Sequence, residues 1–309
     1  MLDFITKLLK TLFFVFLIIQ FVPAIFVSTK HLLEEAMVPK VHVGLINVNG
    51  LIHDASFYTK RIDAFLKDEE VKGLILRINS PGGYSGCCEA VYNELKRFGK
   101  KKPIVAVIEN VGASGAYHLA AAAHTIIASP LSIVGSIGVF MELPNIRQLL
   151  ESWHVHFSYV QSGKYKTVGS MNKDLSPEEQ AYLQRLADDQ YNCFVRTIAE
   201  ARKLNPADSA TWADGQSFTG RQALQLKLID KLGSISDGIE EVKSLAALDH
   251  DVKLVRIPKS SGLLRQLIAS GDEEGGEGLD VAASVASFAH DVTSKWVAQA
   301  TTCQVPATA

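Results

Sequence analysis

Residues 73–83 read GLILRINSPGG, and this segment is the most informative about the fold. It begins as an apolar run of strand length and ends in a turn rich in proline and glycine. Further apolar runs lie at 43–48, 103–108 and 125–128, and segments with helical spacing lie at 56–67, 87–98 and 114–123. Strands that are separated by helical segments of this length favour right-handed crossovers and a mostly parallel sheet with both faces buried. The sequence therefore predicts an α/β fold.

The second half of the chain is expected to be more helical. Ser176 is followed by Pro-Glu-Glu, a capping sequence for a long helix that runs to about Lys203. Shorter helices are predicted over 220–226 and 234–247. With these elements, the core domain is expected to span 41–248.

The N-terminal segment has the properties of a membrane anchor. Residues 11–28 contain no charged side chain, and Lys10 and Lys30 lie on either side of the span. At about 1.5 Å per residue, a helix of this length matches the roughly 30 Å hydrocarbon core of a bilayer. The lysines before the span indicate a cytoplasmic N-terminus, with the bulk of the chain on the other side. Residues 1–30 are therefore predicted to be an anchor, and a cleaved signal peptide is the alternative.

The C-terminal residues 249–309 are expected to form a tail. An acidic, glycine-rich stretch at 271–278 is typical of a flexible linker. Beyond it, apolar residues from Val281 to Trp296 recur at helical spacing, which predicts an amphipathic helix that docks against another surface.

The composition excludes several classes of protein. Apolar residues make up 47% of the 309-residue chain, so it is not disordered as a whole. The formal charge of −2 provides no field for nucleic acid, and no nucleic-acid partner is expected. Four cysteines without a C-x-x-C spacing exclude both a disulfide scaffold and a zinc ribbon.

Ser114 is the first candidate for chemistry. It follows the strand predicted at 103–108 and opens a helix, where the positive helix end lies near its hydroxyl. Gly115 then offers a free backbone N–H beside the hydroxyl, as acyl transfer requires. Gly82 and Gly83 end another strand and can turn their N–H groups toward a ligand. The alternatives are a helix-capping serine and an ordinary turn.

A nucleophilic serine needs a base. His118 lies one turn beyond Ser114, but no histidine has an evident partner in the sequence. His154 and His156 alternate near a strand predicted at 155–160, and we interpret them as a solvated strand face and not as metal ligands.

Two lysines in the loop after that predicted strand are the other candidates for the base. They are Lys164 and Lys166, within the segment SGKYKTVGS that starts at Ser162. A lysine acts as a base near neutral pH when an apolar, closed site lowers its pKa by roughly two to three units. The alternative is a pair of ordinary solvent-facing lysines.

Four motifs in order resemble the signal peptide peptidase A family, which is peptidase family S49. They are Asn79–Gly83, Gly112–Gly115, Gly135–Val139 and Ser162–Lys166. The resemblance covers about 43–248, and it includes a later segment that ends in Leu228-Ile-Asp. The sequence departs from the family's pattern at three positions. Glycine is commoner at the position of Ala116, aspartate is commoner at the position of Thr167, and a small residue is usual at the position of Tyr84.

The resemblance implies a Clp protease/crotonase-like α/β superfold and a Ser–Lys dyad. Mapped by motif, Ser114 is the nucleophile and Lys166 the general base, with Lys164 as the alternative base. Gly83 and Gly115 supply the oxyanion N–H groups. The family needs no cofactor and no metal.

The resemblance also implies a place and a substrate. The short, single-copy bacterial members are anchored in the inner membrane through a segment like 11–28, with the catalytic domain on the periplasmic side. They form ring-shaped homo-oligomers in which serine and lysine from neighbouring protomers meet. Their substrates are remnant signal peptides and other apolar, membrane-proximal peptides. The alternatives are a stomatin-cleaving type of membrane protease, a crotonase-like enzyme acting on CoA esters, and a membrane-tethered scaffold without activity.

Overall fold

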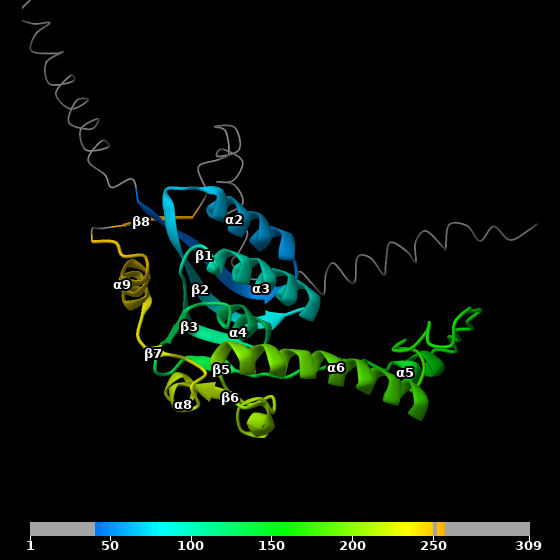
Figure 1. Cartoon of the computed structure of the whole chain (residues 1–309). Coiled ribbons are helices and arrows are strands. Elements are labelled where there is room, and N and C mark those ends of the chain that lie inside the picture. The colour runs from blue at the N-terminus through cyan, green and yellow to red at the C-terminus, as the bar shows by residue number, and fades with distance from the viewer. Residues whose placement is uncertain (1–40, 250–251, 257–309) are drawn as a thin grey trace, which may run out of the picture.

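The computed structural model describes residues 41–249 and 252–256 (Figure 1). Its sheet has eight strands in the order β6-β5-β3-β2-β1-β8, with β4 paired to β3 and β7 paired to β4. The strands are β1 (His42–Ile52), β2 (Val71–Gly83), β3 (Ile104–Ala113), β4 (Thr125–Ala128), β5 (Ile133–Gly135), β6 (Ser217–Thr219), β7 (Lys231–Leu232) and β8 (Lys253–Val255). Within the described residues, every pairing except that of β5 with β6 is parallel, which confirms the predicted mostly parallel sheet.

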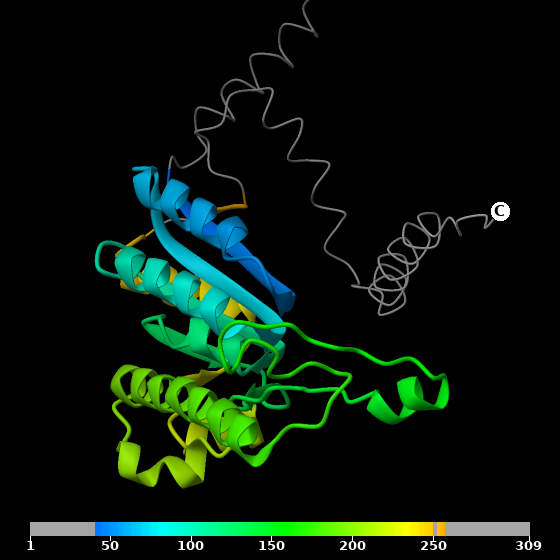
Figure 2. The ribbon, with the colours of Figure 1, turned by 90° about the vertical axis from the view of Figure 1, so that its right-hand side faces the viewer.

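Helices cover both faces of the sheet. They are α2 (Ala55–Lys67), α3 (Ser85–Gly99), α4 (Gly115–Ala120), α5 (Arg147–Ser152), α6 (Pro177–Arg202), α7 (Ser209–Trp212), α8 (Gly220–Gln225) and α9 (Ile235–Leu245), and a 3₁₀ turn lies at Pro206–Asp208. Figure 2 shows α2 and α3 side by side in front of the sheet and α9 behind it.

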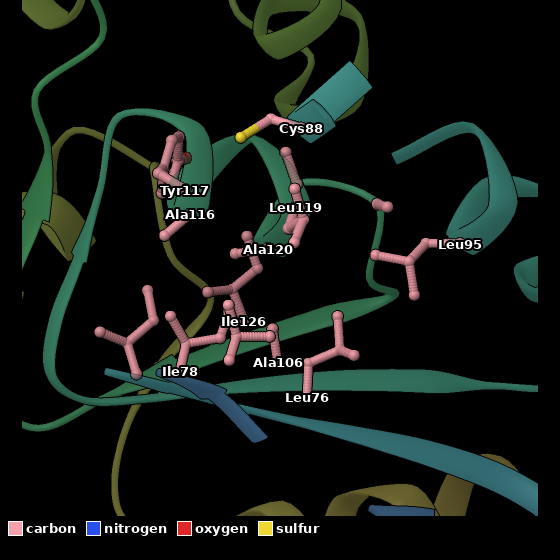
Figure 3. Packing of buried hydrophobic residues seen from close by; sticks show 14 of the residues in the cluster. Leu76, Ile78, Cys88, Leu95, Ala106, Ala116, Tyr117, Leu119, Ala120 and Ile126 are labelled. Atoms are coloured by element: carbon pink, nitrogen blue, oxygen red, sulfur yellow. The ribbon is translucent and has the colours of Figure 1, made fainter. Parts of the chain in front are cut away.

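Alternation along β3 explains why this strand is apolar throughout. Ala106 and Ile108 belong to the cluster formed with α2, α3, α4 and α6, whereas Val105 and Val107 pack with Val242 of α9. Figure 3 shows residues of the first cluster, with side chains of α4 lying over Leu76, Ile78, Ala106 and Ile126 of the sheet. A parallel strand that is buried on both faces has no side to present to water, so its sequence shows no polar alternation.

The long helix begins where the capping sequence predicted. Ser176 accepts a hydrogen bond from the Glu179 backbone N–H at 3.2 Å, and the Glu179 carboxylate accepts one from the Ser176 N–H at 3.0 Å. Lys203, at the other end, has a φ of 54° and closes the helix in the left-handed conformation. The prediction of this helix is confirmed.

One predicted strand is wrong. Residues 155–160 form no strand, and His154, at a φ of 57°, lies in the turn that ends α5. No described strand pairs with this segment, and Phe157 and Val160 are exposed, because it belongs to an arm that leaves the sheet after β5. Alternating apolar residues predict a strand only if another strand lies alongside.

The anchor predicted at 1–30 and the linker and helix predicted beyond 256 lie outside the described residues. The predicted end of the core at 248 is wrong, because residues 253–255, assigned to the tail, form β8 and pair with β1. None of the helices within 41–249 combines the length and the apolarity needed to cross a bilayer.

Candidate active site

Ser114 occupies a strained position between β3 and α4. Its backbone has φ 51° and ψ −125°, outside the regions that a residue with a side chain ordinarily adopts. The Ser114 backbone N–H donates to the Gly135 carbonyl oxygen at 2.7 Å, and the Ser114 backbone carbonyl oxygen accepts from the His118 backbone N–H at 3.0 Å. These two bonds hold the residue in a conformation that it would not otherwise keep.

The Ser114 hydroxyl does not cap α4. It makes no hydrogen bond to the first turn, nor to any other group in the part of the chain that the structure describes. The interpretation of Ser114 as a capping residue is therefore wrong. The strain and the unbonded hydroxyl are typical of a side chain that is presented to a ligand.

The backbone N–H of Gly83 faces the same region. The next N–H, that of Tyr84, donates to the Ile52 oxygen at 2.9 Å on the β1 side of the strand. Because consecutive N–H groups point to opposite edges of a strand, the Gly83 N–H is directed to the other side, where β3 lies. A Cβ on Gly83 would come within 2.0 Å of the Ile52 oxygen, so no residue with a side chain fits there.

Gly115 brings the second N–H next to the first. A Cβ on Gly115 would lie 3.2 Å from the Gly83 nitrogen and 2.3 Å from the Cys88 sulfur. The absence of a side chain on both glycines lets the two backbones approach each other beside Ser114. The structure thus brings together Ser114, Gly83 and Gly115, which are three of the four residues chosen from the sequence.

A pocket of about 400 Å³ opens beside these residues. Its lining includes Gly83, Ser114 and Gly115, together with Cys88 and Glu89 of α3, His118 of α4, Gly138 and Val139 after β5, and Gln190, Cys193 and Phe194 of α6. The walls on α3 and α6 are separated by about a hundred residues of sequence, so no local pattern could have identified them.

His118 is the pocket residue that the sequence left without a partner. Its ring is stacked on that of Phe194, with centroids 5.0 Å apart, and lies at a tilt to the Tyr92 ring, with centroids 4.6 Å apart. Its Nε2 lies 3.4 Å from a carboxylate oxygen of Glu89. Burial lowers the pKa of His118, and the nearby Glu89 carboxylate opposes this effect.

The two candidate lysines lie away from this pocket. Lys164 and Lys166 are on the loop before α6, and neither lines the Ser114 pocket of its own chain. Lys164 forms an ion pair with Glu178, which raises the pKa of its ammonium group. The Lys166 side chain is exposed and makes no hydrogen bond or ion pair within the described residues.

These lysines belong to an arm formed by residues 139–175. Figures 1 and 2 show it, with α5 near its end, extending away from the sheet. The arm exposes several large apolar side chains, namely Phe140, Leu149, Trp153, Phe157, Tyr159 and Val160. Exposed apolar residues in this density are typical of an interaction surface.

The remaining site candidates are ordinary. His154 and His156 do not meet a third ligand, and no group of three His, Cys, Asp or Glu suited to a metal occurs in residues 41–249 or 252–256. Cys87, Cys88 and Cys193 are free thiols.

Several known proteins are similar to this chain over most of its length. A putative protease of Synechocystis sp. is 39% identical over 236 residues, which cover 75% of this chain and 84% of that protein. A putative protease of Methanocaldococcus jannaschii is 37% identical over 64% of this chain and 63% of that protein. A putative signal peptide peptidase SppA of Enterococcus faecium is 30% identical over 70% of this chain and 66% of that protein.

The sequence profile of peptidase family S49 matches residues 96–249, which include Ser114, Gly115 and Lys166. The resemblance read from the motifs is thereby confirmed, and the chain belongs to peptidase family S49 and is a peptidase.

Proposed function

We propose that this protein is a serine endopeptidase in which Ser114 is the nucleophile and Lys166 the general base. The observation that carries the proposal is the arrangement at Ser114. A strained serine with an unbonded hydroxyl lines a pocket, beside the N–H groups of Gly83 and Gly115. Acyl transfer requires this combination of nucleophile and oxyanion donors.

The reaction follows from these roles. Neutral Lys166 takes the proton from Ser114, whose oxygen attacks a peptide carbonyl. The N–H groups of Gly83 and Gly115 stabilise the resulting oxyanion, and losing one such donor raises the barrier by about 3–4 kcal/mol. Lys166 then protonates the leaving amine, and water hydrolyses the acyl-enzyme.

Lys166 suits the role of base better than Lys164. Lys164 is held by Glu178, and the raised pKa of its ammonium group opposes the neutral form that a base requires. Lys166 has no such partner among the described residues, so no ion pair holds it away from Ser114 of another copy.

The location of Lys166 leads to a proposal about assembly. Because Lys166 does not line the Ser114 pocket of its own chain, we propose that the arm of a second copy delivers it. The apolar side chains exposed on residues 139–175 support this contact between copies. A closed ring of such head-to-tail contacts completes every site.

The cellular role rests on the sequence. We propose that the catalytic domain adopts the Clp protease/crotonase-like superfold and that residues 11–28 anchor it in a bacterial inner membrane, on the periplasmic side. Its substrates would then be remnant signal peptides and other apolar peptides, which a tethered enzyme meets at high effective concentration.

The dyad is tested with single variants of the purified, full-length assembly. Ser114→Ala and Lys166→Ala should each abolish hydrolysis of an apolar fluorogenic peptide. Lys164→Ala, a change of the same kind two residues away, should retain turnover. Undiminished hydrolysis by Ser114→Ala or Lys166→Ala would reject the dyad, and an inactive wild type would favour a scaffold.

Mixed assemblies test the shared site. Co-expressed Ser114→Ala and Lys166→Ala chains should regain roughly a quarter of wild-type activity, because one interface in four then combines an intact serine with an intact lysine. If both groups came from one chain, the mixture would stay inactive.

A further inference from the structure

The Ser114 pocket contains a carboxylate that the proposed reaction does not use. Glu89 of α3 lines the pocket, and no Lys or Arg of the same chain lines it within the described residues. The Lys166 that a second copy is proposed to deliver acts as a neutral base and adds no positive charge. The nearest basic group to Glu89 among the described residues is His118, with Nε2 and the carboxylate oxygen 3.4 Å apart, and the two form an ion pair only if His118 is protonated. The pocket therefore carries a negative charge whenever His118 is neutral.

Two neighbouring side chains orient the Glu89 carboxylate. The Asn93 side chain donates to one carboxylate oxygen at 3.1 Å, and His118 approaches the other. His118 is 7% exposed, lines the pocket and has no hydrogen-bond partner for Nε2 within the described residues. Burial lowers the pKa of His118, which favours the neutral ring over a cation that would cancel the charge on Glu89.

The next pocket along α6 has the same sign of charge. It measures about 320 Å³ and shares Gly138 and Val139 with the Ser114 pocket. Asp188 and Asp214 line it, and again no Lys or Arg among the described residues does so. The carboxylates of the two neighbouring pockets favour cationic groups over anionic ones.

We propose that the Ser114 pocket selects a lysine or arginine side chain of the substrate, with Glu89 as the residue that determines this specificity. The hydrocarbon stem of such a side chain packs against Phe194 and Val139, and its cationic end pairs with Glu89. The inference rests on the proposed function, because it assigns the substrate residue next to the bond that Ser114 attacks.

An apolar substrate side chain is less favourable in the Ser114 pocket than a basic one. A leucine or phenylalanine side chain would fill the space but would cover the Glu89 carboxylate without giving it a cationic partner. The Glu89 side chain is 44% exposed, so an apolar side chain laid over it removes water without supplying a cation, which is a cost that a basic side chain avoids. A basic residue within an apolar peptide satisfies both parts of the pocket.

The test compares peptides that differ only in the residue before the cleaved bond. Lysine is set against norleucine, which keeps the stem without the charge, and arginine against citrulline, which keeps the shape without the charge. The wild-type assembly should show at least a tenfold higher kcat/KM for lysine and for arginine. In Glu89→Gln both ratios should fall to about one. Glu94→Gln, on the same helix but outside the pocket lining, should keep the wild-type ratios.

A binding measurement keeps the inference separate from the proposed reaction. Ser114→Ala should bind the labelled lysine peptide at least tenfold more tightly than the norleucine peptide, and Ser114→Ala combined with Glu89→Gln should lose this difference. Absence of all cleavage with this binding difference retained would reject the reaction and keep the pocket assignment. If the wild type cleaves the norleucine peptide with a kcat/KM equal to or higher than that for the lysine peptide, the assignment of the pocket is overturned and the proposed reaction stands.

Discussion

At the scale of single residues, the space around Gly115 limits what can stand beside the nucleophile. A Cβ there would meet the Cys88 sulfur at 2.3 Å, and the thiol is buried in α3. Burial also raises the pKa of the Cys88 thiol to about 12, so it stays protonated and acts as a small packing group. The Cys88 sulfur on α3 therefore limits position 115, which supplies the second oxyanion N–H, to glycine.

We expect Gly115→Ala to destabilise the protein by about 1–3 kcal/mol, because the added methyl group overpacks this contact. It should also abolish activity, since the shift moves the N–H away from the Gly83 N–H. Urea unfolding and peptide hydrolysis measure the two effects. Cys88→Ala in the Gly115→Ala background should restore most of the stability.

Gly86→Ala is the matched control, since a Cβ on Gly86 meets nothing within 4 Å. It should leave the free energy of unfolding unchanged or slightly higher. A Gly115→Ala protein as stable as the wild type would show that the close approach of α3 and α4 is not as described.

At the scale of elements, α6 does two tasks. Its C-terminal half packs into the core through Val195, Ile198 and Ala199, and one turn earlier Gln190 and Cys193 line the Ser114 pocket. The position of that pocket wall therefore depends on where the helix begins and how it enters the core.

The cap at Ser176 sets the beginning of α6. Ser176→Ala leaves the Glu179 backbone N–H without its acceptor, and we expect a loss of about 1 kcal/mol in the free energy of unfolding. Chemical denaturation measures it. Ser158→Ala, in an exposed part of the arm with no hydrogen bond among the described residues, should change nothing. Equal stability of both variants would mean that the cap contributes little.

At the scale of the whole molecule, the arm at 139–175 is the feature that the fold of one chain does not explain. It packs few of its side chains into the core, and it holds Lys166 away from Ser114. An exposed apolar surface of this kind is stabilised by burial against a partner.

We expect Trp153→Asp combined with Phe157→Asp to reduce the assembly to smaller species and to abolish peptide hydrolysis, because charged groups on the contact surface oppose burial. Sedimentation velocity and the fluorogenic assay measure the two effects. Leu245→Asp, an exposed apolar residue of α9, should alter neither. An assembly of unchanged size with full activity would contradict the role of the arm.

Local sequence patterns were enough to predict the alternation of strands and helices, the capped start of α6, the family, and the location of Ser114 at a strand-to-helix junction. Each of these depends on patterns within a few residues or on motifs in order, which survive without knowledge of contacts. The one strand predicted wrongly, 155–160, shows the limit, because alternation does not reveal whether a neighbouring strand exists.

The surroundings of Ser114, in contrast, depend on the packing of the folded chain. Its positive φ, the approach of Gly83 to Gly115, and the convergence of Glu89, His118 and Phe194 on one pocket follow from the packing of α3, α4 and α6 against one sheet. Segments far apart in the chain meet there because the core buries their apolar faces, and no local pattern records which polar side chains are brought together as a result.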